Sequence, residues 1–160
     1  MTQRPARESD GAFLRQLYED VRARDIAAWG PMAETLVPMQ LRAQEGSYRA
    51  QFPDADHRII ECDGVAVGRC IVWRSAHEIR VVDIALLAAH RGRGLGTAVL
   101  TPLCDEARQT GRPLRLHVDA MNEAARRLYE RLGLRVTELV GVQWAMSLDP
   151  VTQASPTQSP

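Results

Sequence analysis

The stretch AAHRGRGLGTAVL, residues 88–100, sets three glycines directly ahead of an apolar run. Ordered structure tolerates glycine where the backbone turns sharply or approaches another group closely. An apolar, strand-like segment precedes this stretch and helical spacing follows it, so the glycines lie in a strand-to-helix loop. The first turn of a helix carries unpaired N–H groups and a partial positive charge, which suit phosphate oxygens. The stretch predicts a phosphate-binding loop; a nucleic-acid contact and a tight packing turn are the alternatives.

Two well-known phosphate loops do not fit this spacing. Counting the dinucleotide fingerprint G-x-G-x-x-G from Gly92 puts Thr97 where the third glycine should stand, and the P-loop ends in Gly-Lys-Ser/Thr, whereas this chain has no lysine. A nucleic-acid-binding segment rich in Arg and Gly would be repeated and disordered, but this loop is single and lies between a strand and a helix. The phosphate therefore belongs to another kind of ligand.

The segments before the loop predict helices followed by an antiparallel meander. A helix is expected after Ser9, and residues 24–53 suggest a loop followed by a second helix. The run RIIECDGVAVGRCIVW, residues 58–73, predicts a hairpin that turns at Asp63-Gly64, because this pair tolerates positive φ. EIRVVDIALL, residues 78–87, is the third strand of the meander.

The segments after the loop predict a crossover and a final hairpin. The helix that follows the loop contains Pro102, which predicts a kink or a late helix start. PLRLHV, residues 113–118, forms the next strand, and a helix over residues 122–132 ends at Gly133. Two strands hinged near Gly141 close the fold.

This order predicts one α/β (α+β) domain over residues 1–148. Its sheet is mixed and mostly antiparallel, with about six to seven strands and about four flanking helices, because the meander pairs antiparallel and the crossover helix adds a parallel pair. Residues 149–160 have no apolar anchor and are expected to form a disordered tail.

Composition restricts the class further. The 160 residues suit one domain, and 20 basic against 20 acidic residues argue against a nucleic-acid partner. No signal peptide and no apolar run near the ~20 residues that span a bilayer are visible, which indicates a cytoplasmic protein without a membrane partner. Three cysteines without C-x-x-C spacing predict reduced thiols, and the scattered histidines predict no metal site.

Two motifs in order resemble the GNAT acyltransferase superfamily. RGRGLG, residues 91–96, is similar to the R/Q-x-x-G-x-G/A motif, with Arg91, Gly94 and Gly96 at the defining positions. NEAARRLYERLGL, residues 122–134, resembles N-x-x-A-x-x-L-Y-x-x-x-G-F, except that Leu134 replaces the aromatic residue. The resemblance covers about residues 4–148, with only a general layout before residue 58. It implies a sheet splayed at the coenzyme-binding strand, acetyl-CoA as cosubstrate and acetyl transfer to a primary amine.

The resemblance also implies which residues bind the coenzyme. The loop would hold the pyrophosphate mainly through backbone donors, and the strand before it would bond the pantetheine arm and the thioester carbonyl through its backbone. Arg93 fits a solvated basic rim equally well, and Asn122 fits a helix cap. The implied binding residues are Leu86, Leu87, Arg91, Gly92, Arg93, Gly94, Leu95, Gly96, Thr97 and Asn122.

Two residues are the expected catalytic pair. By the resemblance, Tyr129 protonates the departing thiolate; otherwise it is a core aromatic whose hydroxyl finds a partner. A base must deprotonate the amine, and Asp83 interrupts an apolar strand just before the coenzyme-binding stretch. A water chain, Glu78 and Glu61 are alternative bases. The alternative for Asp83 itself is a structural role, in which it pairs with a backbone group or an arginine. No cysteine stands at an obvious nucleophile position, so direct transfer in a ternary complex is expected.

The acceptor is expected to be the amine of a small molecule, amino acid or peptide, and the protein a monomer or homodimer. Acceptor choice should reside in residues 24–53 and in the last two strands. A non-catalytic module that binds acyl-CoA and an RNA- or partner-binding domain are the rival functions. Four aromatic residues could line an acceptor pocket, although each also suits a core: Trp29, Tyr48, Trp73 and Trp144. Three acids could attract an amine, although a solvated surface also explains them: Glu34, Glu45 and Asp54.

Overall fold

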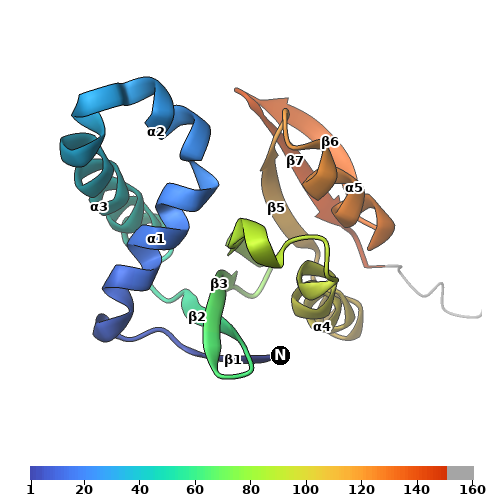
Figure 1. The fold of residues 1–160 in the computed structure, drawn as a ribbon. Helices are drawn as coiled ribbons and strands as arrows, with labels where there is room; N and C mark the ends of the chain where they lie inside the picture. The colour runs from blue at the N-terminus through green and yellow to red at the C-terminus, as the bar shows by residue number, and fades with distance from the viewer. Residues whose placement is uncertain (151–160) are drawn as a thin grey trace, which may run out of the picture.

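A seven-stranded sheet forms the centre of the computed structural model, which describes residues 1–150 (Figure 1). The strand order is β1-β2-β3-β4-β5-β7-β6. The strands are β1 (Thr2–Pro5), β2 (Asp56–Cys62), β3 (Val65–Arg74), β4 (Ile79–Leu86), β5 (Leu114–Asp119), β6 (Arg135–Val140) and β7 (Gln143–Leu148). The α-helices of this part of the chain are α1 (Gly11–Val21), α2 (Ala23–Trp29), α3 (Ala33–Gln51), α4 (Leu95–Thr110) and α5 (Glu123–Arg131).

The pairing confirms the predicted mixed sheet. β4 and β5 run parallel, joined by α4 as the crossover helix. The other neighbouring strands pair antiparallel. The β2–β3 hairpin turns at Asp63 (φ 51°) and Gly64 (φ 77°), as the sequence predicts. The final hairpin turns at Gly141, whose φ is 61°.

Helices cover both faces of the sheet (Figure 1). α4 and α5 pack on one face, where Leu100 of α4 and Leu114 of β5 are fully buried in the larger apolar core. α1, α2 and α3 lie on the other side, where Leu17 of α1 and Val37 of α3 are each 2% exposed. Successive side chains of a strand point to opposite faces of the sheet. Those on one face therefore pack against α4 and α5, and those on the other face against α1, α2 and α3.

Strand β1 was not expected, because its residues are polar. Ionic contacts hold it instead of an apolar pattern: Arg4 Nε donates to Glu61 Oε1 of β2 at 2.6 Å, and Arg4 Nη2 donates to Asp10 Oδ1 at 2.7 Å. Hydrogen bonding from Arg4 lowers the pKa of Asp10 to about 2. β1 therefore joins the sheet through a charge network that hydrophobic periodicity cannot reveal.

The sequence prediction was also wrong at two helix boundaries. Residues 23–29, expected to begin as a loop, form α2. α4 begins at Leu95 and continues through Pro102, so the predicted late start does not occur. Proline removes one backbone hydrogen bond, but the buried apolar face of the helix offsets that loss. Pro38 lies within α3 in the same way, one residue after the buried Val37.

The last strand, β7, ends at Leu148. The predicted tail, residues 149–160, falls almost entirely outside the described residues, which end at residue 150. Within residues 1–150, no helix has both the length and the apolar character to cross a membrane.

Candidate active site

β4 and β5 separate soon after they begin to pair. Their parallel register contains only Ile79 with Leu114 and Arg80 with Arg115. Beyond Arg80 the two strands diverge, which leaves one edge of β4 without a partner strand. The expected splay is thus present, and it opens the sheet in its middle.

The alternation of the β3–β4 ladder shows which backbone groups face this opening. The Leu87 N–H donates to the Val67 carbonyl at 2.9 Å, so Leu87 faces β3. In an antiparallel ladder, alternate residues point to opposite edges, and the groups of Ile84 and Leu86 therefore face the opening. The Leu87 carbonyl accepts from the His90 N–H at 2.9 Å. Of the two leucines in the sequence prediction, only Leu86 keeps its N–H for a ligand.

The glycine loop reaches the opening at the start of α4. Gly92 and Gly94 have φ of 70° and 78°, a backbone region that side chains rarely adopt, and space is open where a Cβ would stand. Gly94 caps α4 without a side-chain hydrogen bond. The N–H groups of Leu95, Gly96 and Thr97 belong to the first helical turn, which has no intrahelical acceptors. These glycines therefore expose a row of backbone donors.

Gly96 has a second function in packing. It is buried, and a Cβ at this position would stand 2.9 Å from Leu128 Cδ2 of α5. A side chain at this position would therefore displace the end of the Leu128 side chain. The packing explanation weighed for the loop thus holds for one glycine of the motif.

The two arginines of the loop differ. Arg91 Nε donates to the Leu86 carbonyl at 3.0 Å, and Arg91 Nη2 lies 3.4 Å from Asp20 Oδ2 of α1. Asp20 Oδ2 also accepts from the Ala88 N–H at 2.6 Å. Arg91 therefore ties the loop to β4 and α1. Arg93 is exposed and forms no ion pair within residues 1–150, which matches a solvated rim.

A β-bulge in β4 decides the direction of Asp83. Ile71 pairs with Asp83, whereas its neighbour Val72 pairs with Val81, so Val82 is an extra residue. In a regular strand without the bulge, residues 81 and 83 would share a face, and Asp83 would point with Val81 into the apolar core beneath α4. The bulge turns the carboxylate to the face that α1 and α3 cover.

Asp83 is ion-paired on that face. Arg69 of β3, whose side chain is 7% exposed, places Nε at 3.0 Å and Nη2 at 2.9 Å from Asp83 Oδ2. Arg69 also contacts Glu45 of α3 and lies over the Tyr48 ring at 5.7 Å. Both Arg69 contacts use Oδ2, and Asp83 Oδ1 accepts no hydrogen bond from the described residues. Asp83 is therefore paired with an arginine, one of the alternatives that the sequence analysis left open. Its Oδ1 remains for other partners.

Burial has the largest effect on the pKa of Asp83. Removal from water raises the pKa of its carboxyl, and the Arg69 charge lowers it by less. Arg69 is the main residue that the sequence analysis missed. Its signal was a charged residue within the apolar run of β3, a pattern that burial tolerates only with a partner.

Tyr129 lies on α5, 7% exposed, at the same cleft. Burial, with a smaller contribution from the Asp83 charge, raises the pKa of Tyr129 to about 12. Its hydroxyl is therefore protonated throughout the neutral range. Asn122 begins α5: its Oδ1 accepts from the Ala125 N–H at 3.1 Å, so the predicted helix cap is confirmed.

A cleft of about 670 Å³ brings Asp83, Tyr129 and Asn122 together. Its walls include Tyr48, with Phe52 and Trp73 in tilted contact, ring centroids 5.4 Å apart. Of the other residues weighed from the sequence, Glu78 lines the cleft, Glu45 contacts Arg69, and Glu61 pairs with Arg4 far from it. The cleft lining does not include Trp29, Trp144, Glu34 and Asp54.

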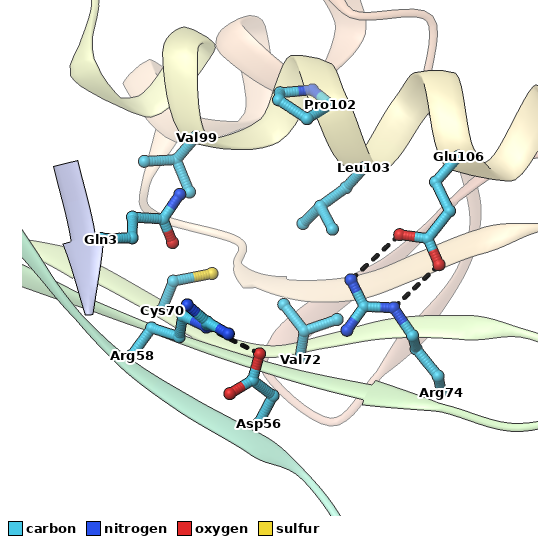
Figure 2. Close-up of a pocket in the computed structure, with 10 residues that line it drawn as sticks. All are labelled: Gln3, Asp56, Arg58, Cys70, Val72, Arg74, Val99, Pro102, Leu103 and Glu106. Carbon is cyan, nitrogen blue, oxygen red and sulfur yellow. Dashed lines mark hydrogen bonds and ion pairs between the residues drawn. The ribbon is translucent and has the colours of Figure 1, made fainter. Parts of the chain in front are cut away.

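A second cavity, of about 260 Å³, lies between α4 and the strands β1 to β3 (Figure 2). Its charged side chains pair with each other: Arg58 Nε donates to Asp56 at 2.8 Å, and Arg74 binds both oxygens of Glu106. Burial raises the pKa of the Cys70 thiol to about 12, so this cysteine is not a nucleophile at neutral pH. The smaller cavity therefore offers neither an unpaired charge nor a reactive thiol among the residues that line it.

Comparisons with known proteins agree with this geometry. The family model described as "Acetyltransferase (GNAT) family" matches residues 14–134. The chain is 29% identical to the L-methionine sulfoximine/L-methionine sulfone acetyltransferase of Salmonella typhimurium, over 93% of this chain and 90% of that protein. It is 27% identical to the L-amino acid N-acyltransferase MnaT of Escherichia coli, with the same coverage. The crystal structure of the PaiA N-acetyltransferase of Thermoplasma acidophilum, in complex with coenzyme A, has a similar fold, with a TM-score of 0.71 and 14% identity over 92% of this chain and 98% of that one.

The splayed mixed sheet, together with a donor-rich loop at a helix start, defines an acyltransferase of the N-acetyltransferase type. Because the family model matches most of the chain, the protein belongs to the GNAT family of acetyltransferases. The resemblance seen in the two sequence motifs is confirmed.

We expect Arg69→Met to destabilise the protein strongly. The substitution leaves Asp83 and Glu45 without their shared cation, and removing one partner of a buried ion pair costs about 3–5 kcal/mol. The raised pKa of Asp83 fixes the sign of the pH dependence: protonation removes the unpaired charge, so the loss should shrink as the pH falls toward about 4. Urea denaturation at several pH values measures it.

Arg15→Met is the matched control, because Arg15 pairs with Glu19 on the exposed face of α1. Exposed pairs contribute at most about 1 kcal/mol. If both variants lost the same small free energy, Arg69 would have no structural importance for the cleft.

Proposed function

We propose that the protein transfers the acetyl group of acetyl-CoA to a primary amine by direct attack in a ternary complex. The observation that carries this proposal is the convergence of three features at one opening of the sheet. These are the free edge of β4, the donors at the start of α4, and the Asp83–Tyr129 cleft.

The residues at the opening fit the coenzyme. The N–H groups of Leu95, Gly96 and Thr97 suit a pyrophosphate, because Gly92 and Gly94 leave the approach free of side chains. The open edge of β4 suits an extended amide-containing arm, which can bond to the strand as a partner strand would. Acetyl-CoA supplies an acetyl group activated as a thioester. The Leu86 N–H donates to the thioester carbonyl, which gains negative charge during attack.

Asp83 and Tyr129 move the protons. Asp83 Oδ1 takes a proton from the acceptor ammonium, which frees the nitrogen lone pair for attack, while Arg69 holds Oδ2 in place. As the new C–N bond forms and the C–S bond breaks, the Tyr129 hydroxyl donates its proton to the departing sulfur, and the second proton that the nitrogen loses restores this hydroxyl. The proposed acid and base thus stand in one cleft, where burial raises the pKa of both groups, that of Tyr129 to about 12.

Release of free thiol from acetyl-CoA, measured across amines, amino acids and peptides, tests the function directly. We expect release that depends on the amine and increases with its concentration. Coenzyme binding without release for every amine would instead support the acyl-CoA-binding module.

Gly94→Val should abolish binding of acetyl-CoA in calorimetry. The new side chain would stand among the backbone donors and would strain a residue whose φ is 78°. Gly111→Val is the matched control: Gly111 ends the same helix with φ of 68° and equally open space, so it adds similar strain without touching the donors. Equal affinity of the Gly94 variant and the wild type would remove the loop from the coenzyme site.

Tyr129→Phe should lower kcat by about 10²-fold, a typical contribution of a general acid, and leave the Kd of acetyl-CoA unchanged. The ring stays in place and only the hydroxyl is lost. Tyr18→Phe, at an equally buried tyrosine of α1, should keep the wild-type rate. A wild-type kcat for the Tyr129 variant would require another proton donor.

Asp83→Asn should lower turnover at neutral pH and recover part of it as the pH rises. Without the base, only acceptor molecules already deprotonated in solution can attack, and their fraction grows with pH. The pH dependence of kcat/KM for the variant and the wild type measures this effect. Two superimposable profiles would exclude Asp83 as the base.

A further inference from the structure

Arg80 lines the acceptor side of the cleft, and Arg115 lies beside it in the adjoining hollow; the acetyl transfer uses neither arginine. Arg80 of β4 and Arg115 of β5 are neighbours in the last register pair before the strands separate. We propose that these arginines bind the carboxylate of the acceptor, so that the substrate class is a free α-amino acid. This inference rests on the proposed acetyl transfer and names its acceptor.

The arginines share one acid. Glu78 Oε2 lies 3.1 Å from Arg80 Nη2 and 3.6 Å from Arg115 Nη1. Two guanidinium groups against one carboxylate leave this group of three with an excess positive charge. Arg80 Nε and Nη1 donate to no acceptor within residues 1–150, and planar guanidinium donors match carboxylate geometry. Arg80 therefore has donors left for the carboxylate of a ligand.

Arg80 stands on the correct face. Its register partner is Trp73, and Asp83 pairs with Ile71 on the same side of β3, so Arg80 and Asp83 share a face of the sheet. Three residues along a strand span roughly 10 Å. Because the Arg80 side chain is long, its guanidinium can lie closer to the Asp83 carboxylate than the two backbones do. An acceptor can contact both ends of this stretch at once.

The two ends carry opposite excess charge. At one end, Arg69 is a single cation between Asp83 and Glu45, which leaves an excess negative charge. At the other end, Arg80 and Arg115 surround Glu78. An α-amino acid has the complementary charges, with the ammonium toward Asp83 and the carboxylate toward Arg80.

Other titratable groups stand around this end, and Glu138 and Asp149 line the adjoining hollow together with Arg80 and Arg115. His117 of β5 lines the cleft beside Arg80, and burial together with the Arg80 charge lowers its pKa, so it is neutral at pH 7. Asp149 accepts from the Ser147 hydroxyl at 2.8 Å, and Asp119 Oδ1 accepts from the Met121 N–H at 2.8 Å. Glu138 stands beyond His117, in the hollow that adjoins the cleft at Arg80.

The aromatic wall indicates the side chain of the acceptor. Tyr48, Phe52 and Trp73 form the remaining side of the cleft, next to the stretch between Arg80 and Asp83. Apolar side chains are stabilised against such a surface. The preferred acceptors are therefore amino acids with apolar side chains.

Thiol release with leucine, methionine and phenylalanine, compared with the carboxamide of each, tests this proposal. We expect kcat/KM to be at least about 10-fold higher for the free acids, although the amides have the larger fraction of neutral amine at pH 7. One good charged pair accounts for a factor of this order. Arg80→Gln should lower kcat/KM for the free acids about 10-fold or more and leave the amides unchanged, with Arg80→Lys retaining part of the preference.

The variants need two controls. Arg127→Gln, on the exposed face of α5, should leave both substrate series unchanged. Arg115→Gln changes a half-exposed side chain and reports on the same site if Arg80→Gln does not fold. Equal kcat/KM for acids and amides, or an equal loss on both from Arg80→Gln, would overturn the carboxylate site.

The experiment separates this proposal from acetyl transfer itself. Turnover with amines but without preference for acids overturns only the carboxylate site. No turnover with any amine overturns the proposed function. Calorimetric titration of the coenzyme-loaded protein with phenylalanine and phenylalaninamide then still decides the site, because tighter binding of the acid supports it and equal binding overturns it.

Discussion

The structure depends on one constraint: β4 pairs with β5 over two residues and then separates from it. A sheet that opens in its middle leaves backbone groups without partners, and such groups are costly unless a ligand or water satisfies them. The opening places the free edge of β4 beside the start of α4 and beside the N-terminal turn of α5. A ligand that enters there meets backbone donors from one helix and a buried tyrosine from the other. The proposed binding site is therefore a consequence of incomplete strand pairing.

A second consequence concerns charge. The bulge at Val82 brings Asp83 out of the apolar core, and this rotation creates a need for a cation on the opposite face. Arg69 supplies it and simultaneously contacts Glu45 of α3. The helix that carries Tyr48 and Phe52 is thereby tied to the strand that carries the proposed base. The proposed acceptor wall and the proposed base are thus positioned by the same buried ion cluster.

Much of the fold could be predicted because its signals are local. Alternating and helical periodicity located the meander and the helices α4 and α5, and Asp63-Gly64 located a turn through backbone preference. The strand β1 gave no such signal, since Arg4 holds it through contacts with Glu61 and Asp10. Pro102 gave a misleading signal, because burial of the α4 face outweighs the loss of one hydrogen bond. Where a contact between distant segments determines the position or the end of an element, the local sequence pattern does not predict it.

The sequence by itself determined the order of the elements, the glycines that free the start of α4, the Asn122 cap and the resemblance to the GNAT family. Each of these follows from residues that are close together in the chain. Only the tertiary structure decided that Arg69 occupies Asp83 Oδ2, that the Leu87 N–H is already bonded to Val67, and that Gly96 admits Leu128. The physical reason is the same in each case: the partner comes from a distant segment, and folding alone brings the two groups within contact distance.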